Sequence, residues 1–282
     1  MHSLKLVALL LILALGVLLL GGCSSSSAQA KKLNVSGSTT ILPIAEESAD
    51  AFKAIHPDVT VLVSGLGSSA GIEAVSAGTA EIGTSSRELA PEEKSNGLVD
   101  FPIAYDGIAV IVNPNNPVSG LAVQQLRDIF SGKIKNWSQL GGSNLPIDLV
   151  NRDDGSGTRD AFQKLVMKDA KFDPAATVLP GTGQVRDVVA RAPGAIGYIS
   201  LGFVKPRFSN VSVKALAVDG VVPSEKTVAD KAYPVGRVLH FFTKGKPTGV
   251  TKEFVDFVLS AKIQKGVVVD AGFIPIAEGG AR

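Results

Sequence analysis

The chain contains little of the chemistry on which most enzyme and metal sites depend. It has one cysteine, Cys23, and three histidines among its 282 residues. One cysteine cannot form an intramolecular disulfide, and so few cysteines and histidines do not predict a transition-metal site. The formal net charge is only +2, so the sequence also lacks the basic excess typical of nucleic-acid-binding proteins. We therefore expect no metal, no cofactor and no nucleic-acid partner.

Residues 1–22 have the pattern of an export signal and are set aside from the fold. Lys5 precedes an almost unbroken apolar stretch, Leu6 to Leu20, which at about 15 residues is short for a bilayer span of roughly 20. The Leu-Gly-Gly-Cys sequence that ends at Cys23 resembles the lipobox of bacterial lipoproteins, and this implies a lipid on that cysteine. An ordinary cleaved signal is the alternative. Residues 23–31 are predicted to be the lipidated cysteine and a flexible tether.

After the tether, apolar β-branched runs alternate with segments of helical periodicity. Val59 to Val63 has the composition of a strand, whereas Ile41 to Ile55 places its apolar residues at helical spacing. This alternating order predicts an α/β fold with parallel strands. Two longer apolar strands are predicted at residues 103–113 and 235–243.

We expect the two long strands to carry the chain between two lobes, with the ligand in the cleft between them. One lobe would be formed by residues 32–110 and 238–282, and the other by residues 111–237. Both ends of the folded chain would thus contribute to the first lobe.

Four short loops built from glycine and hydroxyl residues are the most informative feature of the sequence. They begin at Ser36, Ser64, Gly83 and Arg152, and the fourth reads Arg-Asp-Asp-Gly-Ser-Gly-Thr-Arg. All but the third stand between a predicted strand and a predicted helix, where backbone N–H groups and the helix dipole favour an anion. Any one loop could be an ordinary turn or helix cap. Four such loops in one chain predict a site for a small oxyanion.

These loops and several further segments resemble the phosphate-binding proteins of bacterial phosphate ABC transporters, which have the type II periplasmic binding protein fold. The likeness spans nearly the whole chain after the signal and includes Gly65-Leu-Gly-Ser-Ser-Ala-Gly71, Asp154-Gly-Ser-Gly-Thr158, Pro193-Gly-Ala-Ile-Gly-Tyr198 and the segment 126–142. It implies a two-lobed α/β fold with two chain crossings and an inter-lobe ligand cleft. It also implies an extracytoplasmic, monomeric protein that is not an enzyme and that delivers inorganic phosphate to ABC permease subunits.

By matching position, the resemblance assigns the phosphate ligands to the first, second and fourth loops. These ligands are Thr39, Thr40, Ser68, Arg152, Ser156, Gly157 and Thr158. Three further candidates are Ser38, Arg87 and Asp106. Arg87, like Arg159, either contacts the ligand or pairs at the rim of the cleft. Asp106 either caps or orients Arg152, or accepts a proton from the ligand.

The third loop departs from one known pattern of the family, in which an aspartate accepts a proton from phosphate and repels sulfate. Here that position is Ser86, followed by Arg87. Because a serine hydroxyl can donate or accept, we expect Ser86 to contact the anion as a donor and to discriminate weakly between phosphate and sulfate. Asp106 and Asp153 are the alternative proton acceptors.

Three other interpretations were open at this point. The sequence from Gly67 to Gly71 fits the Gly-x-Ser-x-Gly pattern of serine hydrolases, with Ser69 as nucleophile. Its base would have to be His240, which lies in an apolar run and is expected to be a core residue. The other two keep the fold: binding of another oxyanion such as sulfate or molybdate, or a phosphate sensor that is not coupled to transport.

Overall fold

The computed structural model describes residues 31–205 and 210–276. The predicted export signal and Cys23 lie outside these residues. None of the helices within the described ranges is both long and apolar enough to cross a membrane.

The strands form one mixed sheet whose order is β2-β1-β3-β11-β4-β8-β6-β7, with β9 and β12 paired to β4. Their bounds are β1 (Lys31–Gly37), β2 (Val59–Gly65), β3 (Ile82–Ser85), β4 (Leu98–Val112), β6 (Asp148–Arg152), β7 (Thr177–Leu179), β8 (Ala195–Ser200), β9 (Lys214–Ala215), β11 (Gly236–Lys244) and β12 (Ile274–Pro275). A separate small pair is formed by β5 (Gly120–Leu121) and β10 (Ala217–Val218).

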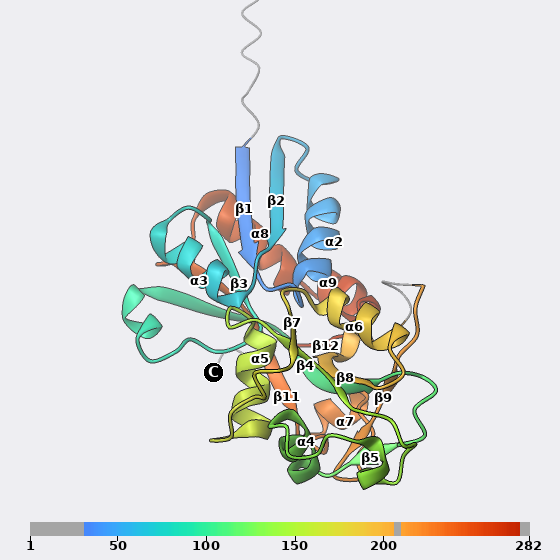
Figure 1. Cartoon of the computed structure of the whole chain (residues 1–282). Helices are drawn as coiled ribbons and strands as arrows, with labels where there is room; N and C mark the ends of the chain where they lie inside the picture. Colours follow the sequence, from blue (N-terminus) through green and yellow to red (C-terminus); the bar gives the residue numbers. More distant parts are fainter. Residues whose placement is uncertain (1–30, 206–209, 277–282) are drawn as a thin grey trace, which may run out of the picture. The chain divides into compact units, whose positions relative to one another are not determined.

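The helices alternate with these strands along the chain (Figure 1). They are α2 (Leu42–Lys53), α3 (Ser68–Ala77), α4 (Val123–Phe130), α5 (Gly157–Phe162), α6 (Thr182–Arg191), α7 (Glu225–Ala229), α8 (Gly249–Leu259) and α9 (Ala261–Ile263). A turn of π-helix, η3 (Gln163–Met167), continues α5. In α2 the residues Ile44, Ala45, Ser48 and Phe52 are buried at the spacing of one helix face.

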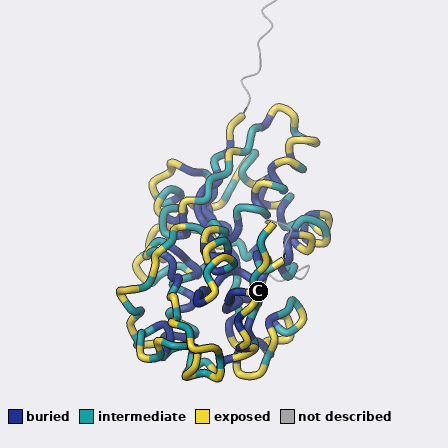
Figure 2. Tube along the Cα trace, turned by 45° about the vertical axis from the view of Figure 1, so that its right-hand side comes forward, coloured by how far each residue is buried: buried dark blue, intermediate teal, exposed yellow. Residues whose placement is uncertain are grey.

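The core contains two aromatic groups from different parts of the chain. Phe52 of α2 packs edge-on against Phe254 of α8, with ring centroids 5.3 Å apart. Farther along the sheet, Phe162 of α5 stacks on Tyr198 of β8 at 4.1 Å. Figure 2 shows buried residues in dark blue within the trace and exposed residues at its turns. Each half of the sheet therefore has its own aromatic group, through which the helices of that half are packed.

Strand β4 changes its partner in the middle, and this is where the chain passes between the two halves of the sheet (Figure 1). Residues 98–107 of β4 pair with β11, whereas residues 108–112 pair with β8. β11 begins at the same level, so that Gly236 lies opposite Gly107, and Arg237 opposite Asp106. The change of partner lies close to the predicted lobe boundary at 110/111. The lobe boundaries themselves stay a prediction.

The predicted α/β fold with two long crossing strands is confirmed, with one correction to strand direction. β1 runs parallel to β3, and β6 parallel to β7 and β8, but β11 and β4 are antiparallel to their neighbours. The sheet is therefore mixed, because the two strands that cross between the halves run in opposite directions. The sequence analysis also missed α6, which follows the short strand β7.

Candidate anion-binding site

The hydroxyl groups of the four loops come together at one buried place. Thr40 Oγ1 of the first loop lies 3.2 Å from Thr158 Oγ1 of the fourth. Ser68 Oγ of the second loop lies 3.3 Å from Ser86 Oγ of the third. These four side chains belong to residues that are about 1% exposed. Loops far apart in the sequence thus converge, as the sequence analysis predicted.

The close approach of the loops requires glycine at position 157. A Cβ atom there would lie 2.4 Å from Ser68 Oγ and 2.8 Å from Ser86 Oγ, closer than any side chain tolerates. Gly157 and Thr158 occupy the first turn of α5, where the backbone N–H groups have no acceptor within the helix. Ser156 Oγ caps this turn by accepting from the Arg159 N–H at 3.2 Å, which leaves the Ser156 hydroxyl hydrogen free to be donated.

Arg152, at the end of β6, is buried at 2% exposure and, among the residues that the structure describes, its side chain donates hydrogen bonds to neutral acceptors only. Its Nε donates to Leu179 O at 3.0 Å and its Nη2 to Pro180 O at 2.7 Å. The guanidinium also reaches the hydroxyls of Thr182 at 3.3 Å and Thr39 at 3.4 Å. Burial lowers the pKa of Arg152, and Arg237 lowers it further, whereas Asp153 opposes the shift. Arg152 therefore brings a positive charge to the site that no hydrogen-bonded carboxylate neutralises.

A second buried guanidinium, that of Arg237, lies on the other side of the hydroxyl groups. Its Nε and Nη2 donate to Asp106 Oδ2 at 2.9 and 2.7 Å, while Asp106 Oδ1 accepts from Ser200 Oγ at 2.8 Å. The remaining Arg237 nitrogen, Nη1, donates to Thr158 Oγ1 at 2.9 Å. Burial raises the pKa of Asp106 and lowers that of Arg237, and each charge opposes the shift of the other.

The structure corrects the predicted role of Asp106. Its carboxylate holds Arg237, not Arg152, and both of its oxygens already accept hydrogen bonds. It is therefore poorly placed to accept a proton from a ligand. By contrast, Asp153 Oδ1 is buried and accepts no hydrogen bond within the described part of the chain. Of the two alternative acceptors, Asp153 thus stays a prediction.

Two residues of the site were missed by the sequence analysis, Arg237 and Thr182. Thr182 begins α6 and is fully buried, with its Oγ1 3.0 Å from Thr39 Oγ1. The sequence pattern that could have indicated it is a Gly-Thr pair followed by two valines at helical spacing, Val185 and Val189. The signal for Arg237 was a single charged residue inside an apolar strand.

The remaining candidates lie around the site in supporting positions. Ser38 Oγ accepts from the Thr40 N–H at 3.2 Å, and so shapes the first loop. Arg87 forms an ion pair with Glu93 at 2.6 Å, and Arg159 forms one with Asp154 at 2.7 Å. These ion pairs favour rim pairing over ligand contact for both arginines.

The hydrolase interpretation finds no support in this geometry. Ser69 Oγ accepts from Arg87 Nη2 at 3.2 Å, while His240 Nδ1 lies 2.8 Å from Asp100 Oδ1. His240 is 4% exposed, which confirms that it is a core residue. In residues 31–205 and 210–276, no group of three potential metal-ligating side chains lies close enough to hold an ion.

Taken together, the site holds two guanidinium groups and one ion-paired carboxylate, that of Asp106, so the positive charge of Arg152 is only partly offset, by the neighbouring Asp153 carboxylate. Around it lie the hydroxyls of Thr39, Thr40, Ser68, Ser86, Thr158 and Thr182. Guanidinium groups and hydroxyls can all donate to oxygen, and charge-assisted bonds of this kind are the strong ones. The arrangement suits a small, multiply accepting oxyanion.

Comparison with known proteins agrees with this geometry. The model of the PBP superfamily domain matches residues 24–262. The phosphate-binding protein PstS of Bacillus subtilis is 39% identical over 87% of this chain and 81% of its own length. PstS of Borreliella burgdorferi is 30% identical over 95% of this chain and 98% of its own length. The chain belongs to the family of PstS phosphate-binding proteins.

Solved structures of this family have the same fold. A crystal structure from Clostridium perfringens, named as a phosphate ABC transporter substrate-binding protein with bound phosphate, is 42% identical with a TM-score of 0.82. It is matched over 87% of this chain and all of its own. A phosphate transport receptor from Vibrio cholerae is 34% identical over 86% of this chain and all of its own, with a TM-score of 0.72. These matches confirm the predicted two-lobed periplasmic binding protein fold.

The ion pair between Asp106 and Arg237 generates a prediction about stability. Asp106→Asn leaves the buried Arg237 charge without its partner, so the free energy of unfolding should fall by about 3–5 kcal/mol. The control is Ser200→Ala, which removes one hydrogen bond from the same carboxylate and should cost about 1.5–3 kcal/mol. Urea denaturation without added anion measures both. Equal effects of the two variants would contradict the assigned role of the ion pair.

Proposed function

We propose that this chain captures inorganic phosphate between its two lobes and delivers it to the permease of an ABC transporter. The observation that carries the proposal is the only partly offset charge of Arg152 beside the Arg237–Asp106 pair, ringed by buried hydroxyls. The proposed ligands are the predicted residues Thr39, Thr40, Ser68, Ser86, Arg152, Ser156, Gly157 and Thr158, together with Arg237 and Thr182. The chain carries out no reaction and acts as a transport receptor.

The number of donors is sufficient to replace the hydration of the anion. Each hydrogen bond to a charged group contributes on the order of 1.5–3 kcal/mol. Micromolar binding requires about −8 kcal/mol in total. About four such donors reach that value before the cost of ordering is subtracted, and the further donors at this site offset that cost.

The same contacts explain why the lobes would close on the anion. With the predicted lobe boundaries, Thr40 and Ser86 belong to one lobe, whereas Arg152 and Thr158 belong to the other. A ligand that contacts both lobes binds the closed arrangement better than the open one, and so shifts the population towards closure.

We also propose that the protein is held at the outer side of the membrane by a lipid on Cys23. The support is the lipobox-like sequence and the extracytoplasmic place of this family. We expect Cys23→Ala to release the protein from the membrane fraction, while phosphate binding stays unchanged because none of the proposed ligands lies near Cys23 in the sequence. Fractionation of cells that express each form measures this. A variant that remains with the membrane would contradict the anchor.

Removal of the Arg152 guanidinium should abolish tight binding. Arg152→Ala is expected to weaken phosphate binding by at least about 100-fold, because each charge-assisted bond is worth about 1.5–3 kcal/mol. Arg159→Ala is the matched control, since Arg159 pairs with the exposed Asp154, and it should change affinity by less than about threefold. Titration calorimetry measures both. A loss of less than tenfold for Arg152→Ala would contradict its role.

A comparison of phosphate binding with sulfate binding tests the effect of a serine at position 86. Ser86→Ala should weaken phosphate and sulfate binding alike, because it removes a donor that serves both anions. Asp153→Asn should weaken phosphate only, because fully ionised sulfate has no proton to donate to that carboxylate. Calorimetric titration of the anion-free protein with phosphate and then sulfate at neutral pH gives the comparison. Full phosphate affinity in Ser86→Ala would show that Ser86 is not a ligand, and tighter binding of sulfate than of phosphate would favour the other-oxyanion alternative.

A further inference from the structure

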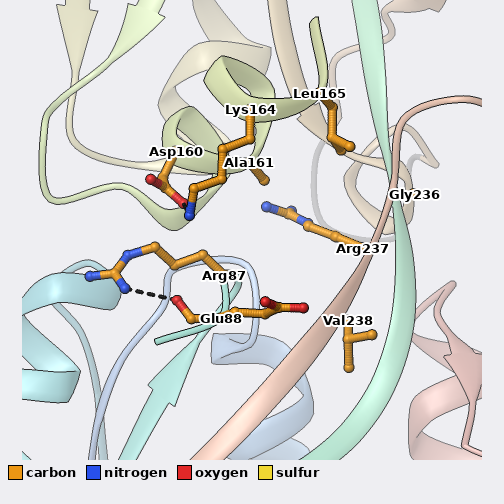
Figure 3. Close-up of a pocket in the computed structure, with 9 residues that line it drawn as sticks. All are labelled: Arg87, Glu88, Asp160, Ala161, Lys164, Leu165, Gly236, Arg237 and Val238. Carbon is orange, nitrogen blue, oxygen red and sulfur yellow. Dashed lines mark hydrogen bonds and ion pairs between the residues drawn. The ribbon is translucent and has the colours of Figure 1, made fainter. Parts of the chain in front are cut away.

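Beside the anion site lies a pocket of about 320 Å³ (Figure 3). Each of its two walls carries both a positive and a negative side chain. One wall is formed by Arg87 and Glu88, which follow β3. The facing wall is formed by α5 and η3, with Asp160 and Lys164. Arg237 projects between the two walls and belongs both to this pocket and to the anion site. The pocket is thus a gap between segments that the predicted boundaries assign to different lobes.

Each wall contains an ion pair that is complete by itself. Arg87 forms a two-pronged pair with Glu93, with Nη1–Oε2 and Nη2–Oε1 distances of 2.6 and 2.8 Å. On the other wall, Lys164 Nζ lies 2.8 Å from Asp160 Oδ2. Arg87 is also fixed by Ser69 Oγ and by Glu88 O, so its position does not depend on the facing wall. Each wall therefore keeps its own ion pair when the lobes separate, and Glu88 adds a further negative charge to the wall that carries Arg87.

The two ion pairs face each other with their signs crossed. The hydrogen bond from Arg87 to Glu93 raises the pKa of Arg87, and the carboxylate of Asp160 across the pocket adds to that rise. The pKa of Glu93 is lowered chiefly by Arg87, with a smaller contribution in the same direction from Lys164. Arg87, Asp160 and Lys164 line the same pocket, and the charges of the two ion pairs act on each other across it with opposite signs. Approach of the two walls is electrostatically favourable.

We propose that Asp160 and Lys164 are positioning residues that stabilise the closed arrangement of the lobes by acting on the Arg87–Glu93 pair. The proposal rests on the proposed function, because closure matters only for a protein that closes on its ligand. The four residues contact no anion. They raise the fraction of molecules that are ready to bind, and the apparent dissociation constant falls in inverse proportion to that fraction.

The strength of this effect should be modest and should depend on salt. The side chains of Asp160 and Lys164 are 34% and 58% exposed, and exposed charges interact weakly. The Debye length falls from about 10 Å at 0.1 M salt to about 3 Å at 1 M, so attraction across the pocket is screened at high salt. A weak attraction favours closure without trapping the ligand, as delivery to a permease requires.

The test exchanges the charges on one wall. Asp160→Lys combined with Lys164→Asp keeps the net charge but places like charges opposite one another. We expect phosphate binding to weaken by about three- to tenfold at 20 mM sodium chloride, and the difference from the natural chain to vanish towards 1 M. The control makes the same exchange in the ion pair of α8, with Lys252→Asp and Asp256→Lys, and should leave affinity unchanged. Calorimetry with inorganic phosphate measures each.

Exchange of the charges on the other wall should restore binding. Adding Arg87→Glu and Glu93→Arg recreates the crossed arrangement, and phosphate affinity should recover to within about twofold. Small-angle scattering of the anion-free protein should show a larger radius of gyration for the first exchange than for the natural chain or the fourfold variant. If the fourfold variant does not fold, the double variant Asp160→Asn with Lys164→Gln provides the test. It removes both charges from this wall and should therefore reduce the salt dependence of the phosphate dissociation constant.

The outcomes separate the two proposals. If the natural chain does not bind phosphate, the proposed function fails. If it binds phosphate but the first exchange leaves affinity and radius of gyration unchanged, the positioning role of Asp160 and Lys164 is wrong. A weakened variant that keeps its deficit at 1 M salt would also overturn the electrostatic explanation.

Discussion

The ion pair between Asp106 and Arg237 is the interaction on which the rest of the site depends. It joins β4 and β11 where the chain crosses between the halves of the sheet, and the side chains of Arg237 and Asp106 are only 4% and 0% exposed. Arg237 can reach the hydroxyls of Thr158 and Thr40 only because Asp106 compensates its charge. Without the carboxylate, two guanidinium groups would share one buried volume, at a large cost in desolvation and repulsion. With it, one positive charge remains for a ligand.

Much of the fold and of the anion site could be predicted from the sequence alone, because the four loops have local sequence patterns. Glycine and hydroxyl residues after apolar strands marked the converging loops, and their resemblance to the phosphate-binding proteins indicated the fold. Arg237 could not be found in this way, since a charged residue in a strand usually points to solvent. The partner of Asp106 depends on which residue of β11 lies opposite it, and that register is set by tertiary pairing. The assignment of individual ligands stays a prediction.

The anion site and the charged pocket beside it contribute to ligand binding in different ways. Contacts in the anion site depend on which oxyanion is present, because they are hydrogen bonds to its oxygens. The facing ion pairs of the pocket are indifferent to the ligand, and affect only how readily the lobes meet. A substitution in the anion site should therefore alter selectivity between oxyanions. A substitution in the facing ion pairs should change the affinity for every ligand by the same factor.

The pairing of β4 with β11 has a mechanical consequence. Residues 98–107 of β4 are hydrogen-bonded to β11, so the two crossings are joined there into a single ribbon and are not two independent hinges. A rotation of one lobe about such a ribbon moves each residue in proportion to its distance from the axis. Asp106 and Arg237 lie on the ribbon itself and travel least, whereas Thr39 and Arg152 lie farther from it on opposite arms. The Asp106–Arg237 pair would thus remain in place throughout opening, and the charge of Arg152 would swing in with the outer donors to enclose the anion.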